Sequence, residues 1–274
     1  MKMLSKPISE ESNKFYRYIP TINNACTVLL LALVSCLASH KASAQSKPGK
    51  AEVPDWALPG SATHKQVPPP PDFHRPTQTE NKSIGIFDGQ SDVGGPLVSG
   101  SSSYNKATGQ YTINSAGYNI WYTRDEFRFL WKKMSGDVSL AADISFPDTA
   151  GYLDRKVVLI VRQNLEDDSK EAMAGLHGGG LIHLAWRPEK GQMMKDMKVD
   201  GKGAVRLGLE KRGNAFAIFV SHAGEAMHQF GDPIQLDIDE PFYVGIGFCS
   251  HIPDKVATGI LSNVVLENAA GKVR

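Results

Sequence analysis

The sequence predicts an all-β protein folded as an antiparallel β-sandwich or jelly roll. From about Ser83 onward, short apolar or alternating runs are separated by turn residues, and no segment there has ten residues of clean helical periodicity. Roughly a dozen strands with regular turns favour a sandwich that hides most of its strand edges. Residues 76–274 fit one domain of this kind.

The composition excludes several classes of protein. Of the 274 residues, 41% are hydrophobic and 22% are charged, which is typical of a globular chain. Thirty basic residues balance 29 acidic ones and no basic run stands out, so the charge of a nucleic-acid-binding protein is missing. A mean hydropathy of −0.26 and a single apolar stretch exclude a membrane protein with several spans.

Turn residues and alternation locate the strands. Gly213-Asn214 between two alternating runs predicts a two-residue hairpin, and Gly136-Asp137 predicts another turn. The nearly continuous apolar run at 156–163 predicts a strand that is covered on both faces. We expect strands at residues 109–115, 125–133, 138–146, 156–163, 171–177, 181–187, 205–212, 215–221, 233–239, 242–250 and 259–268.

Alternation also predicts which side chains share a face of the sheet. Within residues 181–187, His183 and Arg187 fall on the same face. The glycines at 178–180 form a turn that brings His177 and His183 onto adjacent strands, where the two imidazoles could face each other. A hydrogen-bonded histidine in a sheet and a metal ligand are the two alternatives for this pair.

Residues 1–44 are predicted to be a signal peptide. Basic residues precede an uncharged run at 25–39, and Ala42-Ser43-Ala44 supplies an A-x-A cleavage site. This run is shorter than the ~20 residues that span a bilayer comfortably as a helix. The residues ending in Cys36 also resemble a lipobox, so acylation of Cys36 is the alternative processing route. Both routes predict export to the periplasm or beyond, the second with a lipid anchor.

Residues 45–75 are predicted to be a Pro-rich extended linker. Prolines 68–71 favour polyproline II and cannot join a sheet ladder. Trp56 and Phe73 either dock onto the domain or serve a partner. Cleavage after residue 44 would leave Cys249 as the only cysteine, without an internal disulfide, and its apolar run predicts a buried hydrophobe rather than a nucleophile.

An ordered set of motifs resembles a known family. The set comprises Trp121-Tyr122, Asp125-x-Phe127, Trp131-Lys132, Ser135-Gly136-Asp137 and a strand that ends in Val161-Arg162. It resembles the concanavalin A-like jelly-roll domains (the lectin and glucanase fold) of unknown function in bacterial secreted proteins. The version that follows the propeller in some TolB-like biopolymer-transport proteins is the most similar. The resemblance covers residues 76–268, and this chain has too few preceding residues for a propeller. It implies a shallow concave sheet, which in relatives of the fold often holds sugars.

Aromatic and polar residues on one concave face form the candidate ligand site. Sugars offer apolar faces for aromatic stacking and hydroxyls for forked donors. The alternative is that the tryptophans fill the core and that Arg162 pairs with Asp125 or Glu126. The candidate ligand-binding residues are Trp121, Trp131, Arg162, His183, Arg187 and Tyr243.

Two acidic patterns resemble functional sites but do not predict a catalytic or metal site. Glu166-x-Asp168-x-x-Glu171 has the carboxylate spacing of jelly-roll glucanases, but its polar neighbours indicate a solvated turn, so we assign no catalytic residue. Asp88 and Asp92 lie in a Gly-rich stretch and offer too few of the about 6–8 oxygen ligands that calcium takes. We therefore expect no cofactor and no metal, with an ordinary turn favoured over a structural Ca²⁺ site.

Three functions stay open at this point. The first is a non-catalytic secreted or periplasmic module that binds carbohydrate or another envelope component. The second is a structural or protein-interaction domain of the envelope, similar to a Tol scaffold. The third is a glycan-active hydrolase or lyase. We expect no nucleic-acid partner and no transmembrane helix in the mature chain.

Overall fold

The computed structural model describes residues 53–58, 70, 72–199, 204–223 and 225–274. All of these residues belong to the second of the chain's two units, Pro48–Arg274. The predicted signal peptide and most of the predicted linker lie outside the described residues. Among those described, one short 3₁₀ turn, η1 (Asp55–Ala57), is the sole helical element. The described residues therefore contain no candidate for a membrane-spanning helix.

Two antiparallel sheets form the second unit, which confirms the predicted all-β sandwich of jelly-roll type. The eight-stranded sheet has the order β1 (Gln78–Glu80), β2 (Gly89–Val93), β7 (Phe127–Met134), β16 (Phe242–Cys249), β9 (Lys156–Arg162), β10 (Glu171–His177), β11 (Ile182–Arg187) and β12 (Lys195–Val199). The seven-stranded sheet has the order β15 (His228–Gln235), β14 (Ala215–His222), β13 (Ala204–Arg212), β8 (Val138–Ser145), β17 (Ala257–Glu267), β4 (Gln110–Ser115) and β3 (Ser101–Asn105).

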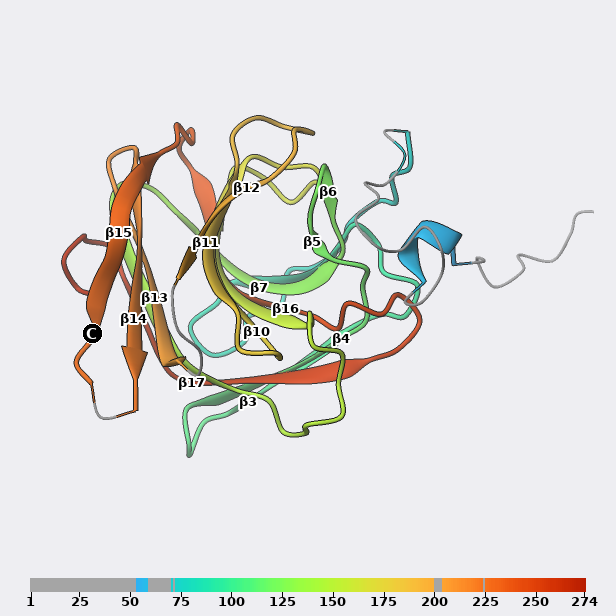
Figure 1. The fold of residues 1–274 in the computed structure, drawn as a ribbon, viewed down its shortest axis with the longest axis horizontal. Helices are drawn as coiled ribbons and strands as arrows, with labels where there is room; N and C mark the ends of the chain where they lie inside the picture. Colours follow the sequence, from blue (N-terminus) through green and yellow to red (C-terminus); the bar gives the residue numbers. More distant parts are fainter. Residues whose placement is uncertain (1–52, 59–69, 71, 200–203, 224) are drawn as a thin grey trace, which may run out of the picture. The chain divides into compact units, whose positions relative to one another are not determined.

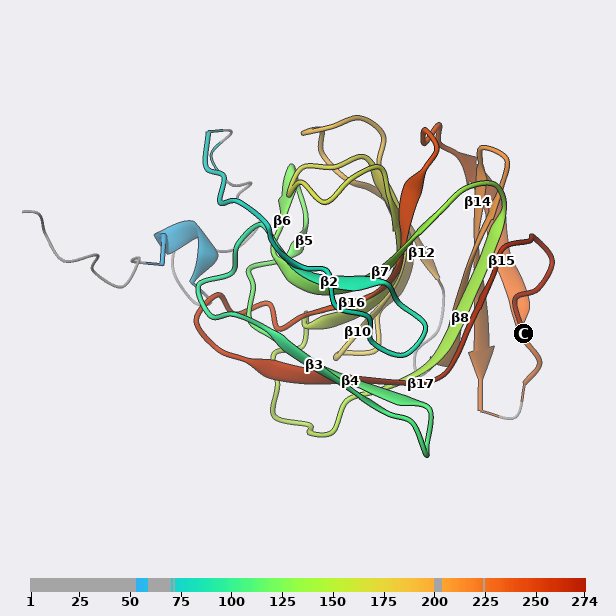
Figure 2. The ribbon, with the colours of Figure 1, turned by 180° about the vertical axis from the view of Figure 1, so that it is seen from behind.

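A small hairpin lies inside the curve of the eight-stranded sheet. It consists of β5 (Ile120–Trp121) and β6 (Arg124–Asp125). Figures 1 and 2 show the eight-stranded sheet bending around this hairpin, with the seven-stranded sheet on the convex side. The hairpin therefore faces the concave surface that could hold a ligand.

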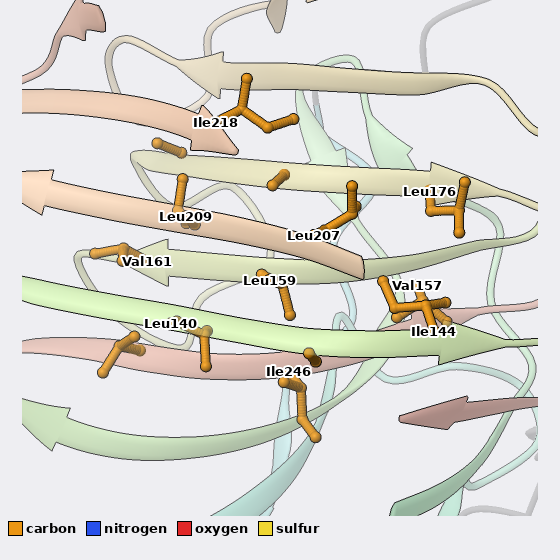
Figure 3. Close-up of a cluster of buried hydrophobic side chains, with 14 of the residues drawn as sticks. Leu140, Ile144, Val157, Leu159, Val161, Leu176, Leu207, Leu209, Ile218 and Ile246 are labelled. Atoms are coloured by element: carbon orange, nitrogen blue, oxygen red, sulfur yellow. The ribbon is translucent and has the colours of Figure 1, made fainter. Parts of the chain in front are cut away.

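The central strand β9 shows why the sheet is covered on both faces. Val157, Leu159 and Val161 belong to the cluster between the two sheets, whereas Val158 and Ile160 belong to a second cluster on the concave face. All seven residues of the strand are buried, as its continuous apolar pattern predicts. Figure 3 shows side chains from both sheets meeting in the first cluster, among them Leu140, Leu159, Ile218 and Ile246.

Turn residues occupy the expected places. Gly213 has a φ of 54°, a conformation that glycine adopts without strain, and with Asn214 it links β13 to β14. Gly136 has a φ of 79° between β7 and β8. The prediction of a Gly-rich turn at Asp88–Gly95 was wrong for most of that stretch, because its middle forms strand β2, whose five residues are all buried.

Candidate functional site

Strand register arranges the concave face in rows. Tyr243, Arg162, Glu171 and Arg187 lie opposite one another across β16, β9, β10 and β11. Four residues away along β9, a second row contains Val158, Gly175 and His183. The rows separate the concave face into an end with ion pairs and an end with a pocket.

At one end, two arginines and two carboxylates form a sealed ionic cluster. Asp125 Oδ2 accepts hydrogen bonds from Arg162 Nη1 and Arg187 Nη1, both at 2.8 Å, and Asp125 Oδ1 accepts one from Arg187 Nη2 at 2.7 Å. Arg162 also donates to Glu171. All four side chains are 0% exposed. Because Asp125 belongs to β6, the cluster fastens the hairpin to the sheet.

Burial and charge set the protonation of this cluster. Burial favours a neutral Asp125, but the charges of Arg187 and Arg162 outweigh it and hold the pKa of Asp125 below its usual value. For Glu171, burial is the largest influence and raises the pKa to about 7. The positive charge of Arg162 opposes this increase, and the negative charge of Asp125 adds to it. Two buried carboxylates with separated pKa values are a feature of acid–base catalysis. Here neither borders the pocket, since both face arginines.

At the other end a pocket of about 450 Å³ opens beside the hairpin. Its wall combines aromatic rings with histidine, lysine and aspartate side chains. The lining residues are Tyr118, Asn119, Trp121, Tyr122, Tyr152, Asp154, Lys156, His177, Leu181, His183, Asp196, Lys198 and His251.

The floor of the pocket is made of buried basic side chains. Lys156, His177 and His183 project from adjacent strands β9, β10 and β11, and they are 2%, 6% and 2% exposed. Burial lowers the pKa of His177 to about 3 and also lowers that of His183, so both imidazoles are neutral at pH 7. Burial lowers the pKa of Lys156 to about 8, so this lysine stays mostly charged at pH 7.

The two histidines keep free hydrogen-bonding capacity. His177 Nδ1 lies 3.5 Å from Asp154 Oδ1 and His183 Nδ1 lies 3.9 Å from Asp196 Oδ2, so both carboxylates stand on the Nδ1 side of the rings. On the other side, His177 Nε2 and His183 Nε2 are buried and have no hydrogen-bond partner among the described residues. Such orphaned polar atoms are costly in a folded protein unless a water molecule or a ligand pairs with them.

Aromatic rings are stacked around these histidines. Trp121 lies parallel to His183, with ring centres 5.5 Å apart, and its ring centre lies 5.4 Å from Lys156 Nζ. Tyr152 stacks on His251 at 4.9 Å. The rings therefore give the pocket flat apolar surfaces next to polar nitrogen atoms.

A glycine makes room for this arrangement. Gly175 stands directly opposite His183, and a Cβ at position 175 would lie 2.7 Å from His183 Nε2. Since real Cβ contacts are never that short, a larger residue would displace the imidazole. The glycine is needed for the close approach of the ring rather than for its backbone angle.

Part of the segment before the sandwich lies near the pocket. Ala57 is 2% exposed and clusters with Tyr118 and Tyr122, and Phe73 is partly buried against the same group. Phe73 also lies 4.8 Å below the guanidinium of Arg124. Phe73 thus docks onto the domain, the first of the two fates expected for it.

The structure divides the six candidate ligand residues into three pairs on the concave face. Trp121 and His183 line the pocket. Arg162 and Arg187 lie in the sealed cluster, which is the structural alternative considered for Arg162. Trp131 and Tyr243 contact each other edge to face at 5.1 Å, away from the pocket, and Trp131 Nε1 donates to Ser91 Oγ at 2.9 Å.

The acidic motifs occupy structural positions. Glu166 forms an exposed ion pair with Lys190, whereas Glu171 is in the sealed cluster. Asp92 lies 3.3 Å from Arg128 and Asp88 lies 3.2 Å from Lys132.

One group of potential metal ligands occurs among the described residues, His74 with Asp167 and Asp168. Asp167 accepts hydrogen bonds from Arg124 Nε and contacts His74 Nδ1 at 2.9 Å. The guanidinium already compensates the charge of this carboxylate.

Several pocket residues were missed from sequence. Lys156 carried a usable signal, because it is the first residue of a strand whose other residues up to Arg162 are all apolar. Tyr118, Tyr152, Asp154 and His251 come from loops that converge only in the folded chain, and no local pattern marks them.

Comparisons with known proteins give similarity of fold alone. No family model matches the chain. No curated protein matches it either. Among solved structures, the chain is similar to a functionally unknown protein from Saccharomyces cerevisiae at 15% identity, with a TM-score of 0.48 over 62% of this chain and 93% of that one. It is also similar to a carbohydrate-binding module from Bacillus subtilis (15%, TM-score 0.43, 62% and 92%) and an alginate lyase from Klebsiella pneumoniae (9%, 0.40, 62% and 85%).

Proposed function

We propose that the pocket on the concave face binds a carbohydrate and that the protein is a non-catalytic binding module. The observation that carries this proposal is the pairing of stacked aromatic rings with unpartnered imidazole nitrogens in one cavity. Sugars present apolar C–H faces that suit the ring of Trp121 and hydroxyls that suit His177 Nε2 and His183 Nε2.

The size of the pocket supports a small ligand unit. A volume of about 450 Å³ lies in the usual range for ligand sites, which is about 300–1,000 Å³. The rim residues Asp154 and Lys198 are exposed, whereas the floor is buried. A sugar unit could therefore enter from solvent and reach the histidines.

The two alternatives have weaker support. A protein-interaction face would present a contiguous apolar patch, but the exposed large hydrophobic residues described, Ile86, Leu153, Met193 and Val256, belong to separate loops. A retaining glycosidase needs two accessible carboxylates about 5–5.5 Å apart. The buried pair of Asp125 and Glu171 is sealed by arginines. The two carboxylates of the pocket, Asp154 and Asp196, each stand next to a different histidine.

Export belongs to the same proposal. The signal-like residues 1–44 would carry the chain to the periplasm or the cell exterior, with Cys36 as the site of a lipid anchor if the lipobox is used. In that compartment the ligand is a carbohydrate or another component of the envelope. The relation to the domains of TolB-like proteins remains part of this proposal.

A titration of the full chain with neutral and acidic oligosaccharides tests the proposal. We expect measurable binding to at least one class and a loss of about tenfold or more with Trp121→Ala, because a central aromatic anchor dominates small binding sites. Tyr243→Ala is the matched control, since this ring lies on the same face outside the pocket. Absence of binding to every glycan, or equal effects of the two variants, would contradict the proposal.

A further inference from the structure

Lys156 is the feature of the pocket that a neutral sugar leaves unexplained. Its side chain is 2% exposed, and it borders the cavity from the middle of the concave sheet. Its neighbours across the sheet are Cys249 on β16 and His177 on β10. Neither is an anion at pH 7, because burial raises the pKa of the Cys249 thiol to about 12 and His177 is neutral.

The ammonium group of Lys156 has few partners. Among the described residues, its one hydrogen bond is donated by Nζ to the carbonyl oxygen of Ile120 at 3.3 Å, and no carboxylate lies within 4.0 Å of it. An ammonium group has three donors. Its other close contact is the face of Trp121, which attracts a cation without pairing its charge.

The carboxylates of the pocket are directed elsewhere. Asp154 stands next to His177 and Asp196 stands next to His183, both at the rim. Asp154, Asp125 and Glu171 act on the ammonium only from beyond contact distance. A buried cation without a counter-ion in contact is unfavourable, and a ligand anion would relieve that cost. Lys156 is the one cation among the floor residues described, and at the rim Lys198 stands with Asp154 and Asp196. This lining suits a ligand with one negative charge better than a ligand with many.

We propose that the pocket is specific for an acidic sugar, a unit with a single carboxylate, and that Lys156 Nζ receives this carboxylate. His177 Nε2 and His183 Nε2 then bond ring hydroxyls beside it. This inference rests on the proposed carbohydrate binding and names the class of sugar. Trp121 stacks on the ring of the same unit.

A matched pair of ligands separates charge from shape. Calorimetric titrations of the full chain would use uronic-acid trimers (glucuronate, galacturonate and mannuronate) and the methyl esters of the same trimers. We expect at least one acid to bind about tenfold or more tightly than its ester, because a charge-assisted hydrogen bond is lost in the ester. Lys156→Met should remove this preference, so that the acid and its ester bind with similar affinity. Lys132→Met, an exposed lysine outside the pocket, should retain the preference.

The outcomes distinguish the two proposals. Equal affinity for acid and ester, or a preference that survives in Lys156→Met, would overturn the role of Lys156 and leave carbohydrate binding intact. Binding of neutral glycans alone would have the same meaning. Binding of no glycan at all would overturn the proposed function itself. Lys156→Arg, which keeps the positive charge, checks folding and should retain part of the preference.

Discussion

Substitution of Asp125 tests how the hairpin is held over the concave face. Asp125→Asn keeps the shape of the side chain and removes its negative charge. Arg162 and Arg187, both 0% exposed, would then share only Glu171 as a counter-ion, and three hydrogen bonds of 2.7–2.8 Å would be weakened or lost.

The expected loss of stability is large. Removing one partner from a buried ion pair costs about 3–5 kcal/mol, because the remaining charge stays buried without compensation. For a chain of this size each kcal/mol changes the midpoint of thermal unfolding by about 2–4 °C. The midpoint of Asp125→Asn should therefore fall by roughly 6–20 °C.

Thermal and urea unfolding of the full chain measure this effect. Glu166→Gln is the control, since its exposed ion pair with Lys190 should contribute about 0–1 kcal/mol. A loss below about 1 kcal/mol in Asp125→Asn, equal to that of the control, would refute the reasoning that the sealed cluster fastens the hairpin.

Three further predictions concern the pocket floor. Gly175→Ala should displace the His183 ring, destabilise the protein by about 1–3 kcal/mol in urea unfolding and weaken glycan binding, whereas Gly179→Ala, whose Cβ has its nearest contact at 3.3 Å, should do much less. Because the pKa of His177 is lowered to about 3, the unfolded chain binds a proton that the native chain does not between pH 6.5 and 3. The free energy of unfolding should therefore decrease as the pH is lowered through that window. Between pH 7 and pH 4, urea unfolding should show a loss about 3 kcal/mol larger in the wild type than in His177→Gln. Equal losses in the two proteins would contradict the assignment. Lys156→Met should unfold at a temperature equal to or higher than the wild type in calorimetry, because it replaces an uncompensated buried cation by an apolar chain; a clear decrease would show that the ammonium is stabilised within the protein.

Much of the fold follows from local patterns in the sequence. Alternation placed His183 and Arg187 on the same face of β11, and the structure confirms it, with Ala185 between them in the concave cluster. The glycine turn brought His177 and His183 together, and their ring centres are 5.0 Å apart. These features depend on neighbouring residues, which is why one sequence suffices to predict them.

Other features depend on contacts between distant segments. Strand β2 reads GQSDV and looks like a polar turn, yet it is buried because it pairs with β7 and its Ser91 hydroxyl accepts a hydrogen bond from Trp131. The path of the β5–β6 hairpin across the concave face has no local signal. Since this path decides that Arg162 is sealed and that Trp121 borders the pocket, alternation alone could not separate the two groups.

Chemical-shift mapping of the tryptophan indoles tests the central claim most directly. The chain has four tryptophans, so their Nε1–H signals are few and can be assigned by Trp→Phe variants. On addition of an oligosaccharide that binds, the signal of Trp121 should move, whereas that of Trp131, which donates to Ser91 at the other end of the face, should stay in place. Movement of the Trp131 signal with a stationary Trp121 would show that the ligand does not occupy this pocket.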